Sequence, residues 1–223
     1  MDRRDPGELD AARARLVRYS ARLLDDGLAV GTAGNISVRA GDIVAVTPSG
    51  IGYRDMRAAD ICLVALDGTQ VPDAGETPSS ETPVHLAIYA ATDAAAVVHT
   101  HSPEVVALSV ARPELPAIHY AIAGLGGPVR VAPYARFGSA GLAAAAVEAL
   151  DGRRAVVLRN HGAVTYGRDL AEAYDRALLL EWLARTYRLA LSYGEPAVLT
   201  AGELDEVTAE TRRRRYGERR GPA

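Results

Sequence analysis

Short apolar segments joined by tight turns occupy the middle of this sequence and constrain its fold more than any other feature. Gly41-Asp42 marks the turn between segments 36–39 and 42–47, and segment 61–66 ends at Asp67-Gly68. Turns this short join antiparallel neighbours, because a parallel connection needs a dozen or more residues. Further strands are predicted at 97–100, 117–121, 129–131, 155–159 and 164–166. Much of the resulting sheet should therefore be antiparallel.

Amphipathic segments that predict helices lie among and around these strands. In segment 8–26 apolar residues recur at helical spacing, and Gly27 ends the pattern. Helices are also predicted at 81–91, 103–110, 139–150, 170–193 and 203–216. No linker or internal repeat divides the chain. We therefore expect one three-layer α/β domain over residues 1–223, with a central mixed, mainly antiparallel sheet flanked by helices.

Composition and charge exclude several classes of protein. Apolar residues make up 48% of the chain, which is enough for a buried core. The net charge of −3 gives no general attraction to nucleic acid or to an anionic membrane. Cys62 is the single cysteine, so no disulfide can form within the chain. Neither a signal-peptide core nor a membrane-spanning apolar run is found, and a cytoplasmic protein is expected.

Three of the five histidines stand where apolar segments end. His99 and His101 are two residues apart, so on an extended strand both rings leave the same face. His161 follows a second apolar segment. Two ligands from one strand and a third from another can hold a divalent metal with a coordination position left open, as a catalytic metal requires. Each histidine taken alone is more typical of a core residue, but the three together favour a metal site.

Three short segments combine small residues with hydroxyl or amide side chains. They are residues 34–37, 47–50 and 79–80. In such turns, backbone N–H groups can converge on a phosphate. Ser80 also stands at the start of the predicted helix 81–91, where the helix dipole favours an anion. Each segment alone is more typical of an ordinary turn or helix cap, so the phosphate hypothesis depends on all three occurring in order with the histidine segments.

Glu81 directly follows these serines, and the Arg-rich residues 212–215 precede Tyr216. A carboxylate beside a metal can act as a general acid or base, particularly where burial raises its pKa toward neutrality. The alternative for Glu81 is a helix N-terminal carboxylate that interacts only with the dipole. For the arginines, a solvated helix end is the simplest interpretation, because four cations on an acidic protein make a small patch for nucleic acid.

Taken together and in order, the motifs of the chain resemble the class II aldolase/adducin family. They are Gly-Asn-Ile-Ser (34–37), Thr-Pro-Ser-Gly (47–50), Pro-Ser-Ser-Glu (78–81), His-Thr-His-Ser (99–102), Ile-His-Tyr (118–120), Ala-Pro-Tyr-Ala-Arg-Phe-Gly (132–138) and Asn-His-Gly (160–162). The resemblance extends from about the first helix to Tyr216-Gly217. Within the family, the chain is most similar to aldolases that act on a ketose 1-phosphate such as L-fuculose 1-phosphate.

The resemblance implies a role for each matching residue. Zinc, or another divalent cation such as Mn²⁺ or Co²⁺, would be bound by His99, His101 and His161. Glu81 would be the catalytic acid/base and would touch the metal in the resting enzyme. The phosphate-binding positions would be Asn35, Ser49, Gly50, Ser79 and Ser80. Tyr120 would protonate the aldehyde oxygen from a neighbouring subunit, Phe137 would line the aldehyde side, and Tyr216 would close over the site. Members are C4 homotetramers with active sites between subunits.

The implied reaction is a retro-aldol cleavage to dihydroxyacetone phosphate and a short aldehyde, with a metal stabilising the enediolate. The chain contains no lysine, so a Schiff-base aldolase mechanism is excluded. The region around residues 124–127 and the Arg-rich tail match the family less well. The aldehyde therefore stays open: L-lactaldehyde, another short aldehyde or a methylthio-aldehyde.

Other members of the family offer alternatives. A sugar-phosphate 4-epimerase usually has Asp at the position of Glu81 and a further Asp after the histidine pair, where this chain has Glu104. A methylthioribulose-phosphate dehydratase is distinguished less cleanly. A non-catalytic adducin-like binding module would lack the intact set of three histidines and Glu81.

Overall fold

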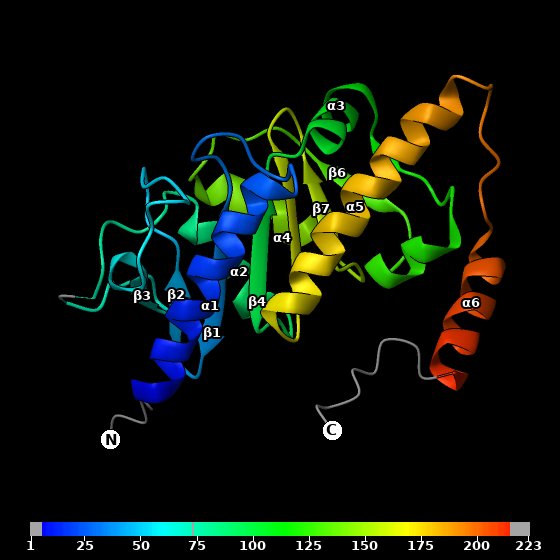
Figure 1. Ribbon diagram of the computed structural model, residues 1–223. Helices are drawn as coiled ribbons and strands as arrows, with labels where there is room; N and C mark the ends of the chain where they lie inside the picture. The colour runs from blue at the N-terminus through cyan, green and yellow to red at the C-terminus, as the bar shows by residue number, and fades with distance from the viewer. Residues whose placement is uncertain (1–5, 73, 215–223) are drawn as a thin grey trace.

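A mixed eight-stranded sheet with the order β3-β2-β1-β4-β8-β7-β6-β5 forms the centre of the computed structural model, which describes residues 6–72 and 74–214 (Figure 1). The strands are β1 (Asn35–Ala40), β2 (Ile43–Val46), β3 (Cys62–Ala65), β4 (Ala96–Thr100), β5 (Glu114–Leu115), β6 (Val129–Ala132), β7 (Ala155–Leu158) and β8 (Gly162–Gly167). β6 and β7 are parallel, and the other neighbouring pairs of these strands are antiparallel.

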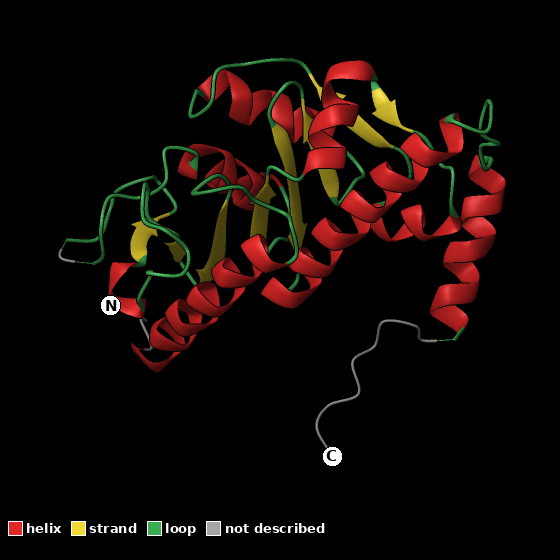
Figure 2. Cartoon of the chain, turned by 45° about the horizontal axis from the view of Figure 1, so that its top comes forward, coloured by secondary structure: helices red, strands yellow, loops and turns green. Residues whose placement is uncertain are grey.

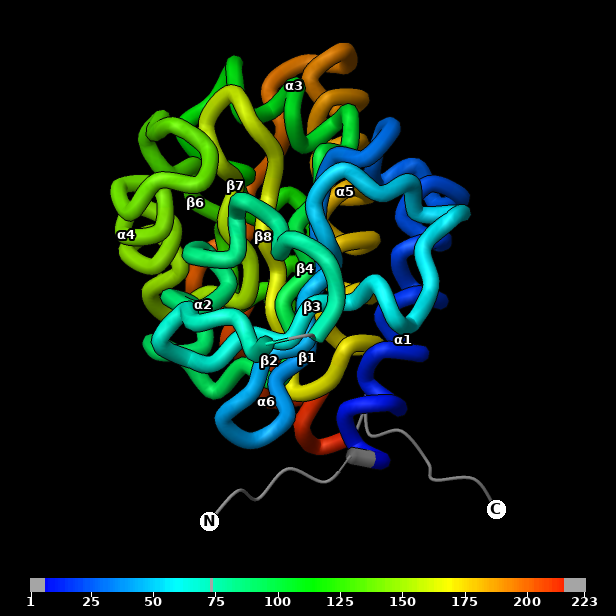
Figure 3. The backbone as a smooth tube through the Cα atoms, turned by 90° about the vertical axis from the view of Figure 1, so that its left-hand side faces the viewer, coloured from blue at the N-terminus to red at the C-terminus, as the bar shows by residue number. Residues whose placement is uncertain are grey.

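Helices cover both faces of this sheet (Figures 2 and 3). One face packs against α1 (Pro6–Asp25), α3 (Pro103–Ala111) and α5 (Leu170–Leu191), and the other packs against α2 (Thr82–Ala91) and α4 (Ala140–Ala149). α6 (Ala201–Arg213) lies beside the 3-10 segment η2 (Tyr120–Leu125), and a second such segment is η1 (Ala58–Asp60). The predicted three-layer α/β fold class is confirmed. None of the helices in the described ranges is long and apolar enough to cross a membrane.

Alternation along β4 divides the core between the two faces. Ala96 and Val98 pack in the cluster that contains α1 and α5, whereas Val97 packs in the cluster that contains α2 and α4. Because side chains alternate along a strand, His99 follows Val97 on the α2 side. The sheet thus directs His99 toward the beginning of α2.

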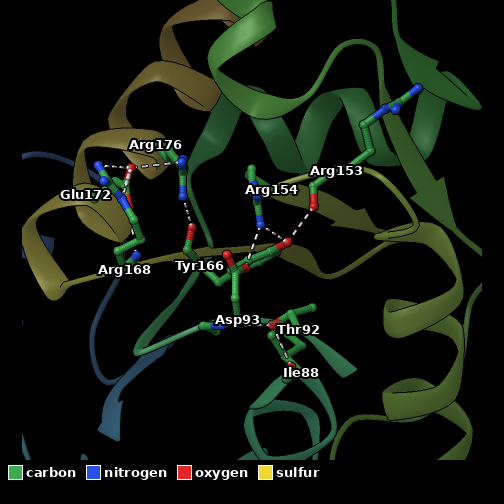
Figure 4. Close-up of polar contacts among 10 residues, drawn as sticks. Ile88, Thr92, Asp93, Arg153, Arg154, Tyr166, Arg168, Glu172 and Arg176 are labelled. Carbon is green, nitrogen blue, oxygen red and sulfur yellow. Dashed lines mark hydrogen bonds and ion pairs between the residues drawn. The ribbon is translucent and has the colours of Figure 1, made fainter. Parts of the chain in front are cut away.

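The end of β8 remote from His161 is held by a polar network around Tyr166 (Figure 4). Arg154 Nη1 donates to the Tyr166 hydroxyl at 2.7 Å and to Asp93 Oδ1 at 2.8 Å, and that hydroxyl donates to the Arg153 carbonyl at 3.0 Å. Arg176 Nη1 on α5 donates to the Tyr166 carbonyl at 2.6 Å. The network joins the start of β7, the end of β8, α5 and the turn after α2.

The predicted strand over 117–121 is wrong. A strand lies earlier, at β5, and η2 begins at Tyr120. His119 is the N-cap of η2, and its Nδ1 accepts a hydrogen bond from Ala121 N at 3.1 Å. This cap satisfies a backbone donor that a strand would have paired with a neighbouring strand, so the chain turns away from the sheet.

Candidate metal centre

Glu81, His99, His101 and His161 come together where the central strand β4 ends and its neighbour β8 begins, on the α2 side of the sheet. Their ligand atoms all lie within 4.8 Å of one another. His99 lies in β4 and His101 directly after it, whereas His161 directly precedes β8. β4 and β8 are antiparallel, with Thr100 paired to Ala163, so the end of one strand meets the start of the other. Glu81 arrives as the N-cap residue of α2.

Hydrogen bonding fixes the orientation of the His99 ring. Its Nδ1 lies 2.9 Å from the carbonyl oxygen of Ala163, which can only accept, so Nδ1 carries the proton. The other nitrogen, Nε2, lies 2.7 Å from Glu81 Oε2 and 2.9 Å from His101 Nε2. Lone pairs this close repel one another unless a cation or a shared proton lies among them. Their convergence is the arrangement of ligands around one ion.

The donor set fits a divalent cation. Glu81 Oε1 is buried and receives no hydrogen bond within the described residues, although His161 Nε2 lies 3.3 Å away. A buried carboxylate oxygen without a donor is costly unless it binds a cation. Three imidazoles and one carboxylate without a thiolate suit zinc and similar first-row ions.

The site holds its carboxylate and one of its imidazoles in the forms that bind metal. Burial alone would raise the pKa of Glu81, but neighbouring His99 and His161 outweigh it and hold the pKa well below its usual range. The net direction is therefore opposite to the rise toward neutrality that burial by itself would produce. Burial, together with His99 and His161, lowers the pKa of His101 to about 3. Glu81 is thus ionised and His101 neutral near pH 7.

Behind Glu81 lies a buried polar chain that the sequence analysis missed. Asn35 Nδ2 donates to Glu81 Oε2 at 3.3 Å, and Asn35 Oδ1 lies 2.5 Å from His85 Nε2. His85 Nδ1 contacts Ser37 Oγ at 2.7 Å, and that hydroxyl contacts the Tyr89 hydroxyl at 2.7 Å. A spacing signal exists: Glu81, His85 and Tyr89 recur every four residues on a helix, and Asn35 and Ser37 alternate on a strand.

The two predicted phosphate loops next to Glu81 adjoin each other. Pro48 and Pro78 form an isolated antiparallel bridge, in which Ser49 N donates to the Thr77 carbonyl at 2.9 Å and Ser79 N donates to the Thr47 carbonyl at 3.3 Å. The Ser79 hydroxyl also accepts from Glu81 N at 3.3 Å. Of the predicted phosphate-binding residues in these two loops, Ser49, Gly50 and Ser80 are exposed. Loop residues that could contact an anion therefore lie directly before α2.

Phe137 lies close to this region. Its side chain is 59% exposed, on the loop between β6 and α4. A Cβ atom on the adjacent Gly138 would lie 2.7 Å from the Ser80 carbonyl oxygen, so the loop lies directly against Ser80. Phe137 is thus placed at the border of the serine loop.

Tyr120 is not part of the cluster. It lies in η2, which packs against α5 and α6, and its ring stacks on His119 with centroids 4.4 Å apart. The side chain is 58% exposed. Tyr216 lies outside the described residues.

Comparisons with known proteins identify the family of the chain and match its fold. The family model "Class II Aldolase and Adducin N-terminal domain" matches residues 14–188. The chain is 40% identical to a 5-methylthioribulose-1-phosphate/5-deoxyribulose-1-phosphate aldolase of Rhodospirillum rubrum, over 91% of each chain. It is 39% identical to a 5-deoxy-D-ribulose 1-phosphate aldolase of Bacillus thuringiensis serovar kurstaki, over 89% of this chain and 94% of that protein. A solved L-fuculose 1-phosphate aldolase superposes with a TM-score of 0.87 at 37% identity, over 91% of this chain and 96% of that chain.

Proposed function

The chain belongs to the class II aldolase and adducin family and is an aldolase, and from this premise we propose that it cleaves a ketose 1-phosphate into dihydroxyacetone phosphate and a short aldehyde. The observation that carries the proposal is the convergence of Glu81 and three histidines beside the exposed loops that precede α2. Side chains that could bind a cation, a carboxylate and exposed loops that could bind a phosphate thus lie next to one another, which supports the proposal.

We propose zinc as the native ion, bound by His99, His101 and His161, with Mn²⁺ or Co²⁺ as substitutes. A divalent cation in this position supplies Lewis-acid stabilisation of the negative charge that develops on the sugar oxygens. The chain itself fixes the ligands: the Ala163 carbonyl holds the tautomer of His99, and burial keeps His101 neutral. A hydrogen bond to the ring nitrogen that does not face the ion orients the imidazole before the ion binds.

Glu81 is the residue we assign to proton transfer. Its carboxylate is buried and ionised beside the histidines, so it can accept a proton at Oε1 and return it. An amine nucleophile is not available, because the chain contains no lysine. No Schiff base can therefore take up the electrons of the broken carbon–carbon bond; a bound divalent cation would stabilise that charge, and the carboxylate of Glu81 would carry the proton.

The phosphate is proposed to bind at Ser49, Gly50, Ser79 and Ser80, where hydroxyls and backbone N–H groups lie before the N-terminus of α2. The helix dipole favours an anion there. Asn35 would contact the phosphate through the second hydrogen of its Nδ2 group, because the first is donated to Glu81 and Oδ1 faces His85.

The aldehyde side requires residues that this chain does not bring to its own metal cluster. Tyr120 is exposed on η2, so we propose that it serves the site of a neighbouring subunit in a homotetramer. Phe137 would line the aldehyde side from the loop against Ser80. Tyr216 is proposed to close over the site.

The substrate we favour is a ketose 1-phosphate with a small apolar end. L-fuculose 1-phosphate, 5-deoxyribulose 1-phosphate and 5-methylthioribulose 1-phosphate share the phosphate end and differ in the aldehyde released. The names of the relatives support all three. The loops before α2 would contact only the common end.

A panel of these three sugar phosphates tests the proposal. The metal-loaded protein should release dihydroxyacetone phosphate from at least one of them, as measured with a coupled reductase, and a chelator should abolish the release. Epimerisation without release would assign the chain to the 4-epimerases, and loss of water without cleavage would assign it to the dehydratases. Purified protein that binds no divalent ion would contradict the metal site.

A further inference from the structure

We propose that His85 is a positioning residue, and that a buried relay from Tyr89 through Ser37, His85 and Asn35 fixes the carboxamide that faces Glu81. The inference rests on the proposed role of Glu81 in proton transfer. It assigns a function to three side chains, those of Ser37, His85 and Tyr89, that do not touch the metal-binding atoms.

All members of the relay are shielded from solvent on two rigid elements. Ser37 and His85 have no exposed surface, Tyr89 is 2% exposed and Asn35 is 4% exposed. His85 and Tyr89 lie one and two turns after Glu81 on α2, whereas Asn35 and Ser37 lie on one face of β1. β1 is itself paired with β4, with Asn35 opposite His99. The relay therefore joins the element that carries Glu81 to the strands that precede the metal ligands.

The chemistry of the groups dictates the direction of each hydrogen bond. Asn35 Nδ2 donates to Glu81 Oε2, so the amide oxygen of Asn35 faces His85. His85 Nε2 then donates to that oxygen. The second nitrogen of a neutral ring, Nδ1, accepts from the Ser37 hydroxyl, which in turn accepts from Tyr89. Burial lowers the pKa of His85 to about 3, which agrees with one donor and one acceptor on the ring.

With the proton of His85 on Nε2, only one orientation of Asn35 satisfies this chain. A flipped carboxamide would place its oxygen against the carboxylate and its NH₂ against the N–H of His85, leaving buried groups without partners. By excluding the flip, the relay directs one donor to Glu81 Oε2, while Oε1 receives no hydrogen bond from the part of the chain that the structure describes. Oε1 is the oxygen that the proposed function uses.

The first test replaces His85. In the metal-loaded protein, His85→Leu should lower kcat by about 10- to 100-fold, the range found for residues that orient a metal ligand shell, with KM and metal content unchanged. His85→Gln retains a donor toward Asn35 and should recover part of the loss. Undiminished kcat in His85→Leu, or a loss of metal that explains the whole effect, would overturn the proposal.

A matched pair of tyrosines separates positioning from stability. Tyr89→Phe and Tyr174→Phe each remove one hydroxyl from a buried tyrosine. The hydroxyl of Tyr89 lies 2.7 Å from Ser37 Oγ, and that of Tyr174 lies 2.8 Å from Asp26 Oδ2. Tyr174 joins α5 to the end of α1, away from the cluster. Only Tyr89→Phe should lower kcat, while both lower the melting temperature. Equal kcat losses in the two variants would overturn the relay.

A measurement without turnover keeps the relay testable if none of the sugar phosphates is cleaved. In ¹⁵N-labelled wild-type protein near pH 7, the His85 ring should be protonated at Nε2 only, and its signals, identified by their loss in His85→Gln, should shift in Ser37→Ala. A ring assigned to His85 that is protonated at Nδ1 would overturn the relay, whatever the activity. Failure of the substrate panel with the expected tautomer would reject the proposed reaction and leave the relay in place.

Discussion

Glu81 is held by opposing effects: burial disfavours its charge, while the neighbouring histidines stabilise the charge. Oε2 receives a hydrogen bond from Asn35, whereas Oε1 lies 3.3 Å from His161 Nε2 and receives no hydrogen bond within the described residues. The proposed proton-transfer role needs this charge, whereas the proposed metal site depends chiefly on the three histidines. The two roles can therefore be separated by a change that removes only the charge.

Glu81→Gln should retain the metal and lose turnover. The amide keeps the shape of the side chain but cannot accept the proton, so kcat should fall by about 10²- to 10⁴-fold, the usual contribution of a general base. Elemental analysis and the rate of dihydroxyacetone phosphate release check both parts. Glu104→Gln is the control, because Glu104 pairs with Arg188 at 2.6 Å outside the cluster and should leave kcat unchanged. An unchanged rate in Glu81→Gln would remove Glu81 from the mechanism.

His85 should also impose a pH dependence on stability. Its folded pKa of about 3 lies below the ordinary value of 6.5, so between these values the unfolded chain binds a proton that the folded chain excludes. Stability is therefore present above pH 6.5 and is lost as pH falls toward 3, at up to about 1.4 kcal/mol per pH unit. Urea unfolding of metal-free protein measures this slope. His85→Gln should show a shallower slope over this window, and an identical slope would contradict the prediction.

At the level of single residues, the four members of the metal cluster could be predicted and the relay could not. His99, His101 and His161 could be recognised as candidate metal ligands because imidazoles at strand ends are unusual. His85 lies within an apolar helix, where a lone histidine is more typical of the core. Its partners Asn35 and Ser37 lie on a distant segment, and only the packing of α2 against β1 brings them together.

The turn before β1 lies directly against the backbone of His99 on β4. Gly34 has φ +83°, and a Cβ atom there would lie 2.7 Å from the His99 carbonyl oxygen. Tyr53 donates to the carbonyl oxygens of Ala33 and Gly34 at 2.9 and 2.6 Å, so the turn is fixed from its other side. The turn therefore has no room to move away from an added methyl group.

Gly34→Ala should cost more stability than Gly27→Ala. Gly27 also has a positive φ, +70°, but nothing lies within 4 Å of an added Cβ. Its substitution should cost about 1–2 kcal/mol for the left-handed backbone alone. Gly34→Ala adds a contact with β4 and should cost a further ~1–3 kcal/mol and weaken metal binding. Denaturant titration and a metal-competition assay check this; equal costs at the two sites would contradict the close approach.

Helices and strands were predicted correctly where one periodic pattern or turn motif dominated the local sequence. The amphipathic period of 8–26 and the turns at Gly41-Asp42 and Asp67-Gly68 correspond to α1 and to the ends of β1, β2 and β3. Segment 117–121 failed because its apolar residues suit a strand equally well, whereas the His119 cap decides the structure through one side-chain hydrogen bond. The edge strand β5 has two residues, too few for any periodic signal.

The whole molecule raises the question of which subunit supplies Tyr120. If the proposed homotetramer builds each site from two chains, Glu81→Gln and Tyr120→Phe subunits should each be impaired alone and recover activity when co-expressed. Random mixing places both intact residues in about a quarter of the sites of a symmetric ring. Native mass spectrometry establishes that hybrids form, and Glu81→Gln mixed with Glu81→Ala serves as the control. Verified hybrids without recovery would place Tyr120 and Glu81 in the same chain's site.

The pairing of β4 with β8 also sets the order of events during folding. His99 and His101 are neighbours in the sequence, but His161 joins them only after β8 has docked, and Glu81 only after α2 has packed on the sheet. Before folding, only the neighbours His99 and His101 can act together as ligands, and two ligands bind a metal weakly. The chain between the ligand-bearing segments forms long loops, which close slowly. Metal acquisition should follow folding here and cannot nucleate it, in contrast to small zinc domains that fold around their ion. We therefore expect the folded apoprotein to be the species that takes up the metal.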